Sequence, residues 1–500
     1  MRKITLSFLI LTAAVVFVFL FSGCMASADA NANLADGGGW YPPYFEPNGN
    51  TDEFNVINEQ PFISASEKPD SYFSLGINTA SYSVIRRSIN SNASIYKDQV
   101  LIEEMLNYFK FDYPVPADGE ILSLSGSISD CPWNGEAHLL TVGIKTEAVE
   151  MGNITSNLVF LIDTSGSMSS SDRLPLVQEA FALLTENLNL NDRVSVVTYA
   201  SSAGVALDGA MGYEKKKITG VIEDLMAGGS TAGAGGIQKA YELAAKYEIA
   251  GGNNRVILAT DGDFNVGISS QYELEKFISQ KRDTGIYLTV LGVGMGNQKN
   301  NKMETLANCG NGNFFFLDSI SEARKVLIEE AGGTLKTVAK DAKAKISFNS
   351  DYVDTYRQLG YENRQLTEAD WNDVNKDAGE LGAGRCITAV YEIILKPGAE
   401  AAVGSLVTAS VQFKVPATDE SRTISLPVSL ASAVPIHDYD IDFISSVVES
   451  ALVMRNSIYK NDAYIGSVIS RLQALQQAGR LSDEYKTEFL TLMVKYRDNS

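Results

Sequence analysis

The sequence predicts an α/β protein: a doubly wound, mainly parallel sheet inserted in, or flanked by, a β-sandwich, with additional helices at both ends. Three observations lead to this fold class. From about residue 157 to 332, buried strands alternate with amphipathic helices, which implies right-handed βαβ units. Segments with strand-like alternation lie on both sides of that stretch. Helical periodicity marks residues 79–109 and returns after residue 437.

The residues before the α/β stretch predict two helices and two strands. In residues 79–90, Ala80, Val84 and Ile89 fall roughly on one helical face, with Arg86 opposite. A second helix is expected at residues 100–109, and Pro114 and Pro116 prevent it from continuing much further. Alternating apolar and polar residues predict strands at 121–128 and 138–145.

Inside the α/β stretch, residues 158–162 form a continuous apolar run, which is typical of a parallel strand covered on both faces. A helix follows, with Pro175 near its first turn and Phe181 and Leu184 on its buried side. Further strands are predicted at 194–199, 256–259, 287–293 and 314–317. Further helices are predicted near 216–226, 236–247, 272–282, 302–309 and 321–331.

After the α/β stretch the pattern returns to strands and then to helices. Antiparallel strands are predicted at 344–348, 387–395, 405–415 and 422–430, and helices at 443–454 and 465–477. One strand leads directly into the α/β stretch and another leaves it, so we expect the α/β domain to be inserted into one β-sandwich. Two independent β domains are the alternative, although the first would have few strands with which to bury a face.

The N-terminus predicts export and a lipid anchor. Arg2 and Lys3 precede an apolar run at residues 4–21, and Ser22, Gly23 and Cys24 follow it. This order resembles a bacterial lipobox, in which the cysteine sulfur receives a diacylglyceryl group and the protein is attached to the envelope membrane. An uncleaved transmembrane helix is the alternative, because about 18 apolar residues suffice to cross a bilayer. Either interpretation places the remaining chain outside the cytoplasm.

These patterns divide the chain into six parts. They are a signal peptide (1–24), a flexible tether (25–60), an N-terminal helical and β region (61–150), the α/β domain (155–333), a β-rich region (340–436) and a C-terminal helical region (437–500). The tether is rich in Ala, Asn, Gly, Pro and Asp, and it carries too little apolar surface to offset the entropy of ordering it.

Composition disfavours several classes of function. The formal net charge of −20 argues against nucleic acid or an anionic membrane surface as partner, because both would repel the chain. The alternative is that the acidity only keeps the protein soluble. The two histidines, His138 and His437, form no zinc-site or Ser-His-Asp pattern. Hydrolytic chemistry of the common kinds is therefore disfavoured.

The cysteine count predicts no disulfide framework. After cleavage before Cys24, the cysteines besides the anchor are Cys131, Cys309 and Cys386, and this odd number leaves at least one thiol without an intramolecular partner. Cys131 and Cys386 both lie in the proposed sandwich, which allows a disulfide between them.

One motif directly after the first buried strand points to a metal. Asp163, Ser165 and Ser167 form a D-x-S-x-S run, with Thr231 in a Gly-Ser-Thr segment and Asp261 in a Thr-Asp-Gly segment. Taken together, these three segments resemble the metal-ion-dependent adhesion site of von Willebrand factor A domains. A D-x-S-x-S run by itself is often only a capped strand-to-helix turn.

The resemblance implies a divalent cation, Mg²⁺ or else Mn²⁺ or Ca²⁺. A hard cation of this kind prefers oxygen ligands, and Ser165, Ser167 and Thr231 offer neutral hydroxyls. Asp163 and Asp261 supply negative charge, directly or through water. With neutral oxygens in much of the first shell, the ion stays electrophilic and can accept a carboxylate from a protein partner. The crevice at the strand ends is also where such sheets bind ligands.

The similarity reaches beyond the α/β domain. The segments Thr79–Ser83 and Cys131–Asn134 resemble the N-terminal region of a bacterial family of A-domain lipoproteins, and Gly360–Arg364 and Asp377–Glu380 resemble its C-terminal region. Relatives often carry acidic residues where this chain has Gly76 and Asn78. Membership implies the fold and the metal, but it names no ligand.

Three functions are compatible with the sequence. The first is a surface-anchored module that binds a protein partner, with an acidic residue of the partner on the metal ion. The second is an envelope structural or assembly factor that uses the A domain as a scaffold. The third, a metal-assisted hydrolase, would need a base or nucleophile beside the metal, and the motif residues are fully used as ligands. We therefore expect a protein that is not an enzyme.

Overall fold

The computed structural model describes residues 54–149, 154–229, 234–262, 271–294, 299–399, 404–481 and 483–499. The signal peptide and Cys24, most of the predicted tether, and Thr231 lie outside the described residues. In the described part of the chain, no helix combines the length and the apolar character that a membrane span requires.

A six-stranded sheet forms the centre of the α/β unit, in the order β10-β9-β8-β5-β6-β7. Its elements are β5 (Ser156–Asp163), η3 (Gly166–Ser169), α3 (Leu174–Glu186), β6 (Arg193–Tyr199), β7 (Ala203–Met211), α4 (Lys215–Glu223), α5 (Ala234–Lys246), β8 (Asn253–Thr260), α6 (Gln271–Arg282), β9 (Tyr287–Val293), α7 (Asn300–Cys309), β10 (Phe314–Leu317), α8 (Ile320–Arg324), η4 (Lys325–Glu329) and α9 (Ala331–Leu335). Every neighbouring pair is parallel except β6 and β7. The predicted doubly wound, mainly parallel sheet is confirmed.

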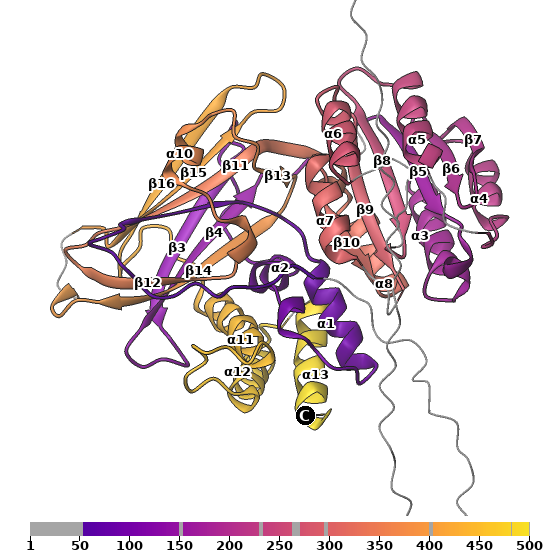
Figure 1. Ribbon diagram of the computed structural model, residues 1–500. Coiled ribbons are helices and arrows are strands. Elements are labelled where there is room, and N and C mark those ends of the chain that lie inside the picture. Colours follow the sequence, from indigo (N-terminus) through magenta and orange to yellow (C-terminus); the bar gives the residue numbers. More distant parts are fainter. Residues whose placement is uncertain are drawn as a thin grey trace, which may run out of the picture. The chain divides into compact units, whose positions relative to one another are not determined.

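Helices cover both faces of this sheet (Figure 1). Alternate residues of β5 point to opposite sides, so that Phe160 belongs to the core under α3 and α4, and Leu161 to the core under α5, α6 and α7. The Phe160 ring stacks on Phe181 of α3, with ring centroids 4.2 Å apart. All eight residues of β5 are buried, which explains the continuous apolar run in the sequence.

Two antiparallel sheets pack face to face and form the β-sandwich. The first has the order β1-β12-β14-β4-β3, and the second has the order β13-β11-β15-β16, with β2 also paired to β11. The strands are β1 (Ile63–Ser64), β2 (Asp70–Ser74), β3 (Leu122–Asp130), β4 (His138–Thr146), β11 (Thr337–Phe348), β12 (Val353–Leu359), β13 (Gly379–Gly382), β14 (Cys386–Leu395), β15 (Val407–Lys414) and β16 (Ser421–Val428). Apolar side chains from both sheets share one core.

Strands from both sides of the α/β unit combine in each sheet of the sandwich. In the first sheet β4 pairs with β14, with Val142 opposite Ala389. In the second sheet β2 pairs with β11, with Phe73 opposite Ala344. This pairing agrees with insertion of the α/β unit into a single sandwich and not with two independent β domains.

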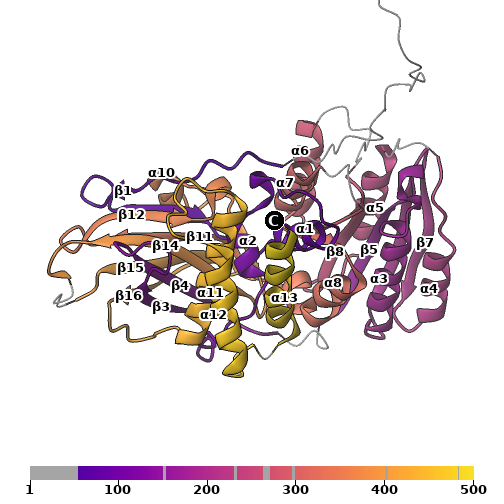
Figure 2. The ribbon, with the colours of Figure 1, turned by 90° about the horizontal axis from the view of Figure 1, so that it is seen from below.

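Helices from both ends of the described chain pack together beside the sandwich, as the two ribbon views show (Figures 1 and 2). The elements are α1 (Ala80–Asn90), η1 (Lys97–Gln99), α2 (Ile102–Asn107), α11 (Asp438–Met454), α12 (Ile465–Gln477) and α13 (Glu484–Asn499); the short η5 (Glu362–Arg364) and α10 (Glu368–Asn372) follow β12. Helix α1 also packs on the α/β sheet through Ala80 and Val84. Its Arg86, expected on the opposite face, is buried as well and pairs with Asp318 and Glu322.

The suggested disulfide between Cys131 and Cys386 does not form. Both thiols are free and buried. The Cys131 sulfur lies 3.9 Å from the Glu392 carboxylate, whereas the Cys386 sulfur contacts the Phe111 carbonyl at 3.5 Å. Glu392 and Cys386 are six residues apart on the same strand, which corresponds to about 20 Å of extended chain, and a disulfide needs Cα atoms within about 7 Å.

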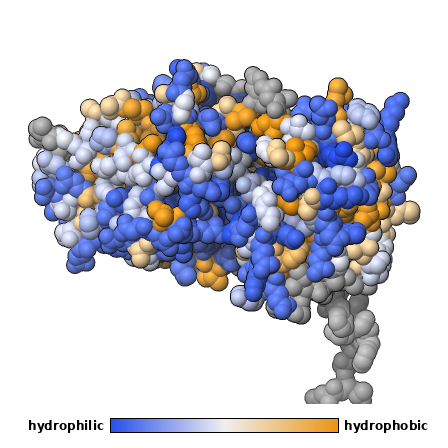
Figure 3. All heavy atoms as spheres, turned by 90° about the horizontal axis from the view of Figure 1, so that it is seen from above, coloured by the Kyte–Doolittle hydropathy of each residue, from blue (hydrophilic) through white to orange (hydrophobic). Residues whose placement is uncertain are grey.

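The surface shown is mixed in hydropathy. On the face shown in Figure 3, hydrophilic residues are interspersed with small hydrophobic patches. Among the residues that the structure describes, large apolar side chains are exposed at several places, and Met226 is the most exposed of them at 84%. Exposures of this kind are ordinary in folded proteins.

Candidate metal centre

The site lies at the carboxyl edge of the parallel sheet. Strand β5 ends at Asp163, and the neighbouring β8 runs parallel to it, with Ile162 opposite Ala259. Asp261 follows immediately after β8, so two carboxylates emerge from adjacent strands at one edge. The Thr260 hydroxyl donates a hydrogen bond to Asp163 Oδ2 at 3.2 Å. The topology thus brings together segments that are almost a hundred residues apart.

The loop after β5 presents two hydroxyls side by side. The backbone N–H of Ser165 donates to Asp163 Oδ1 at 2.9 Å, which folds the loop back on the strand end. The Ser165 and Ser167 hydroxyl oxygens then lie 3.0 Å apart. Two adjacent ligands of an octahedral ion at about 2.1 Å would be about 3.0 Å apart. The described donors therefore fit the hard divalent cation that the motif implies.

A second loop is hydrogen-bonded to this one. The Gly166 N–H donates to the Gly229 carbonyl at 3.0 Å, and the Gly228 N–H donates to the Thr164 carbonyl at 2.8 Å. Gly229 has a φ of +85°, and a Cβ there would lie 2.5 Å from the Ser201 hydroxyl, so any other residue would be strained at this position. Thr231 follows two residues later but lies outside the described residues.

Electrostatics at the site favour a cation. Asp163, Ser165 and Asp261 are each at most 1% exposed. Burial raises the pKa of the Asp163 carboxyl, and the negative charge of Asp261 adds to this, whereas hydrogen bonds from Ser165 oppose it. Burial and the neighbouring Asp163 carboxyl also raise the pKa of the Tyr199 hydroxyl. Two buried carboxyls beside each other are stabilised by positive charge.

Arg173 supplies one positive charge, and sequence reasoning missed it. Its Nη1 donates to Asp261 Oδ2 at 2.6 Å and to the Ser167 carbonyl at 2.8 Å. The side chain lies beside Gly294, where a Cβ would be 2.3 Å from Arg173 Nε. Arg173 stands just before α3, outside the three motif segments, so only the spatial arrangement links it to the site.

The structure brings together four of the five predicted metal ligands: Asp163, Ser165, Ser167 and Asp261. The two histidines lie elsewhere, His138 in β4 and His437 directly before α11. In the described residues the site therefore contains hydroxyls, carboxylates and one guanidinium, but no imidazole.

Models of known protein families match three consecutive parts of the chain, and the middle part corresponds to the α/β unit. The model of the von Willebrand factor type A domain matches residues 157–329. A model described as von Willebrand factor matches residues 48–141, and one described as the C-terminal part of uncharacterized protein YfbK matches residues 333–498. A domains of this kind are generally interaction domains and not enzymes.

Among solved structures, the chain resembles a von Willebrand factor type A protein from Catenulispora acidiphila. The two share 14% identity over 74% of this chain and 89% of that one, with a TM-score of 0.39. It also resembles the ArnB paralog VWA2 from Sulfolobus acidocaldarius, with 14% identity over 76% of this chain and 98% of that one and a TM-score of 0.36.

A relative covers nearly the whole chain. Uncharacterized protein YfbK of Escherichia coli (strain K12) is 36% identical over 471 residues, which span 89% of this chain and 81% of the relative. The resemblance to A-domain proteins with their own N- and C-terminal regions is thereby confirmed. The chain belongs to the YfbK family of von Willebrand factor A domain proteins.

Proposed function

We propose that this protein is an exported, lipid-anchored surface protein that binds a protein partner through a divalent metal ion held by Asp163, Ser165, Ser167, Thr231 and Asp261. The observation that carries the proposal is the pair of serine hydroxyls 3.0 Å apart, beside two buried carboxyls at the sheet edge. An A domain provides the interaction surface, and this donor set suits Mg²⁺, or else Mn²⁺ or Ca²⁺.

Each side chain has a distinct role in this proposal. The metal, when bound, supplies an electrophilic position for a carboxylate of the partner. Ser165 and Ser167 contribute neutral oxygens, so they do not cancel the charge that attracts that carboxylate. Asp163 supplies charge and is held in place by the Ser165 N–H and the Thr260 hydroxyl. The net negative charge of this chain repels acidic partners. The attraction for the partner's carboxylate must therefore come from the metal ion.

The proposal is tested by capture of partners from an envelope extract on the immobilised full chain. With Mg²⁺ present, specific proteins should be retained and then released by EDTA, because the contact passes through the ion. A column carrying Asp163→Asn should retain none of them. Equal retention with Mg²⁺, with EDTA and on the variant column would contradict metal-dependent binding.

The anchor has a separate test. Replacing Cys24 by Ala removes the only sulfur in the lipobox-like segment, so the precursor should stay unlipidated and be either stalled or released from the membrane. Incorporation of labelled fatty acid, followed by membrane fractionation, measures this. If the variant stays in the membrane like the parent chain, an uncleaved transmembrane helix is the correct interpretation.

A further inference from the structure

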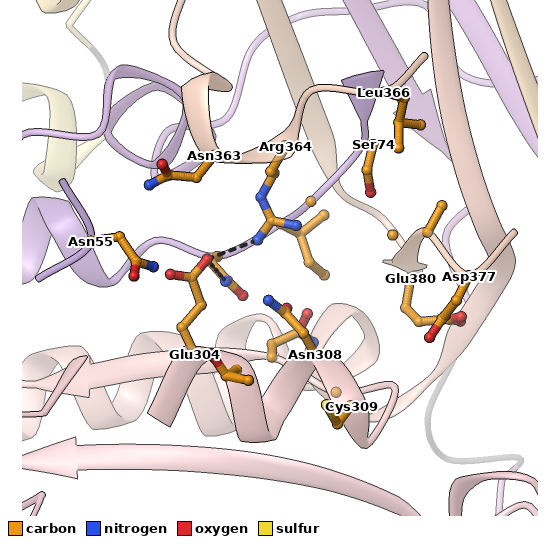
Figure 4. A pocket seen from close by; sticks show the side chains of 18 of the residues that line it. Asn55, Ser74, Glu304, Asn308, Cys309, Asn363, Arg364, Leu366, Asp377 and Glu380 are labelled. Atoms are coloured by element: carbon orange, nitrogen blue, oxygen red, sulfur yellow. Dashed lines mark hydrogen bonds and ion pairs between the residues drawn. The ribbon is translucent and has the colours of Figure 1, made fainter. Parts of the chain in front are cut away.

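A polar cavity of about 380 Å³ lies between α7 of the α/β unit and segments of the sandwich (Figure 4). Its walls include Glu304 and Asn308 of α7, Asn363 and Arg364 of η5, Asp377 just before β13, and Glu380 in β13. None of these residues belongs to the predicted metal site. The volume falls in the range of about 300–1,000 Å³ that is usual for small-molecule sites.

Three sequence segments that the metal site does not use meet at this cavity. Gly76 and Asn78 precede α1, Asn363 and Arg364 belong to the segment Gly360–Arg364, and Asp377 to Glu380 form the third. The chain places them close together although they lie up to about three hundred residues apart. These segments, which flank the α/β unit in the sequence, therefore line the same cavity.

Ion pairs and a glycine keep the walls apart and in place. Arg364 Nη2 lies 3.2 Å from Glu304 Oε1, and Arg282 Nη1 lies 2.5 Å from Asp377 Oδ2. Both pairs join the α/β unit to the sandwich. A Cβ on Gly76 would lie 2.5 Å from Arg364 Cζ, so glycine at this position leaves room for the guanidinium. The cavity is therefore formed before any ligand enters.

Glu380 is the carboxyl in the wall that lacks a cationic partner in the described part of the chain. It is 8% exposed, and its Oε2 makes no hydrogen bond, while its Oε1 accepts only a long one of 3.5 Å from the Asp341 N–H. Burial raises the pKa of the Glu380 carboxyl well above its usual range, and the charges of Asp341 and Asp377 act in the same direction, whereas the Asp341 N–H and the more distant charge of Lys340 oppose the shift without cancelling it. A buried polar oxygen without a partner is costly.

We propose that this cavity binds a small polyhydroxylated amine, with the ammonium group on Glu380 and the hydroxyls on the asparagine side chains of the wall. The ammonium supplies the positive charge and the donors that Glu380 Oε2 lacks. Amide side chains donate and accept hydrogen bonds, which suits hydroxyls. A sugar of hexose size with one amino group has this chemistry.

Other ligand classes fit less well. A divalent cation finds little support in the wall, because two of its carboxyls, Glu304 and Asp377, already pair with Arg364 and Arg282. The described residues also contain no group of three or more His, Cys, Asp or Glu side chains placed to hold a metal at this cavity. An anion would meet three carboxyls in the wall, Glu304, Asp377 and Glu380, against the single guanidinium of Arg364, which already pairs with Glu304. The observations favour a cation with hydroxyls.

The test compares glucosamine with glucose on the purified full chain. The two differ by one ammonium in place of one hydroxyl, so only glucosamine should raise the melting temperature. Cys309 lines the cavity and is partly exposed, so its alkylation by a maleimide, followed by peptide mass spectrometry, reports occupancy of this cavity. Saturating glucosamine should slow that alkylation, and glucose should not.

Two variants connect the effect to this cavity. Glu380→Gln keeps the side-chain shape and removes the charge, and it should weaken glucosamine binding by at least about tenfold. Ala378→Phe fills the cavity without changing Glu380 and should also abolish protection of Cys309. The matched control, Glu223→Gln on the exposed surface of α4, should bind like the parent chain. Unprotected Cys309 in the parent chain, or equal protection in Glu380→Gln and the parent, would overturn the proposal.

Discussion

Replacing Glu330 by Gln is expected to lower the free energy of unfolding by about 3–5 kcal/mol, because it breaks a buried charge cluster on one side only. Glu330 lies directly after η4 and pairs with Lys325 of η4 and with Arg385, the residue before β14. All three side chains are buried. The glutamine would leave two buried cations without their counter-charge and would weaken the contact between the α/β unit and the sandwich.

The Glu330 cluster should also make the free energy of unfolding depend on pH in the acidic range. Burial by itself would raise the pKa of Glu330, but the charges of Arg385 and Lys325 outweigh it and lower this pKa from 4.5 to about 2. A lowered folded-state pKa means that the stabilisation is complete above pH 4.5 and is lost as the pH falls towards 2. The difference corresponds to about 3 kcal/mol. Glu330→Gln should lack this component of the acid-induced loss.

Urea unfolding at pH 7 and at pH 3 measures both effects. Glu329→Gln is the matched control, because Glu329 is the exposed neighbour and accepts only a hydrogen bond from Tyr485. It should change the free energy of unfolding by less than about 1 kcal/mol. A Glu330→Gln variant as stable as the Glu329→Gln control at pH 7 would contradict the assignment of a stabilising buried cluster.

Asp163→Ala is expected to abolish the stabilisation of the chain by Mg²⁺. At a Mg²⁺ concentration of 100 times its Kd, the parent chain should gain about 2.7 kcal/mol by mass action, and the variant should gain nothing. Melting temperatures with and without Mg²⁺ measure this difference. Equal shifts in both proteins would mean that the ion binds elsewhere in the chain.

Without metal, two effects of this variant oppose each other. Removing Asp163 relieves its repulsion with Asp261, which by itself favours stability. However, Asp163 accepts hydrogen bonds from the Ser165 N–H and the Thr260 hydroxyl, and Arg173 already pairs with Asp261. Asp163→Ala leaves both donors unpaired, so we expect a loss of about 1–3 kcal/mol. Asp163→Asn keeps an acceptor oxygen and should lose less.

The fold was predictable wherever burial leaves a clear periodic pattern. Strand β5 is apolar throughout because helices cover both its faces, and α3 carries its apolar stripe because one face meets Phe160. Strand β7 was missed because it is an edge strand whose first four residues are exposed. Strand β12 was missed because it carries Arg357, a charged residue that is buried against Glu392 of β14 and the Tyr459 ring.

The part of the site that lies within a single loop was predictable from the sequence. Asp163, Ser165 and Ser167 are close in the chain, and the parallel register of β5 and β8 adds Asp261. Arg173 and Tyr199 could not be found, because no pattern in the chain says which side chains turn towards those carboxyls. The cavity at Glu380 was also beyond sequence reasoning, since it forms only where separate segments meet.

The most direct test of the account is a crystal structure of the full chain grown with Mn²⁺ and measured at the manganese absorption edge. We predict one strong anomalous peak at coordination distance from the Ser165 and Ser167 hydroxyls, next to Asp163 and Asp261, with Thr231 as a further ligand. No peak at these residues under saturating Mn²⁺, with Arg173 still on Asp261, would contradict a metal-dependent site in this A domain.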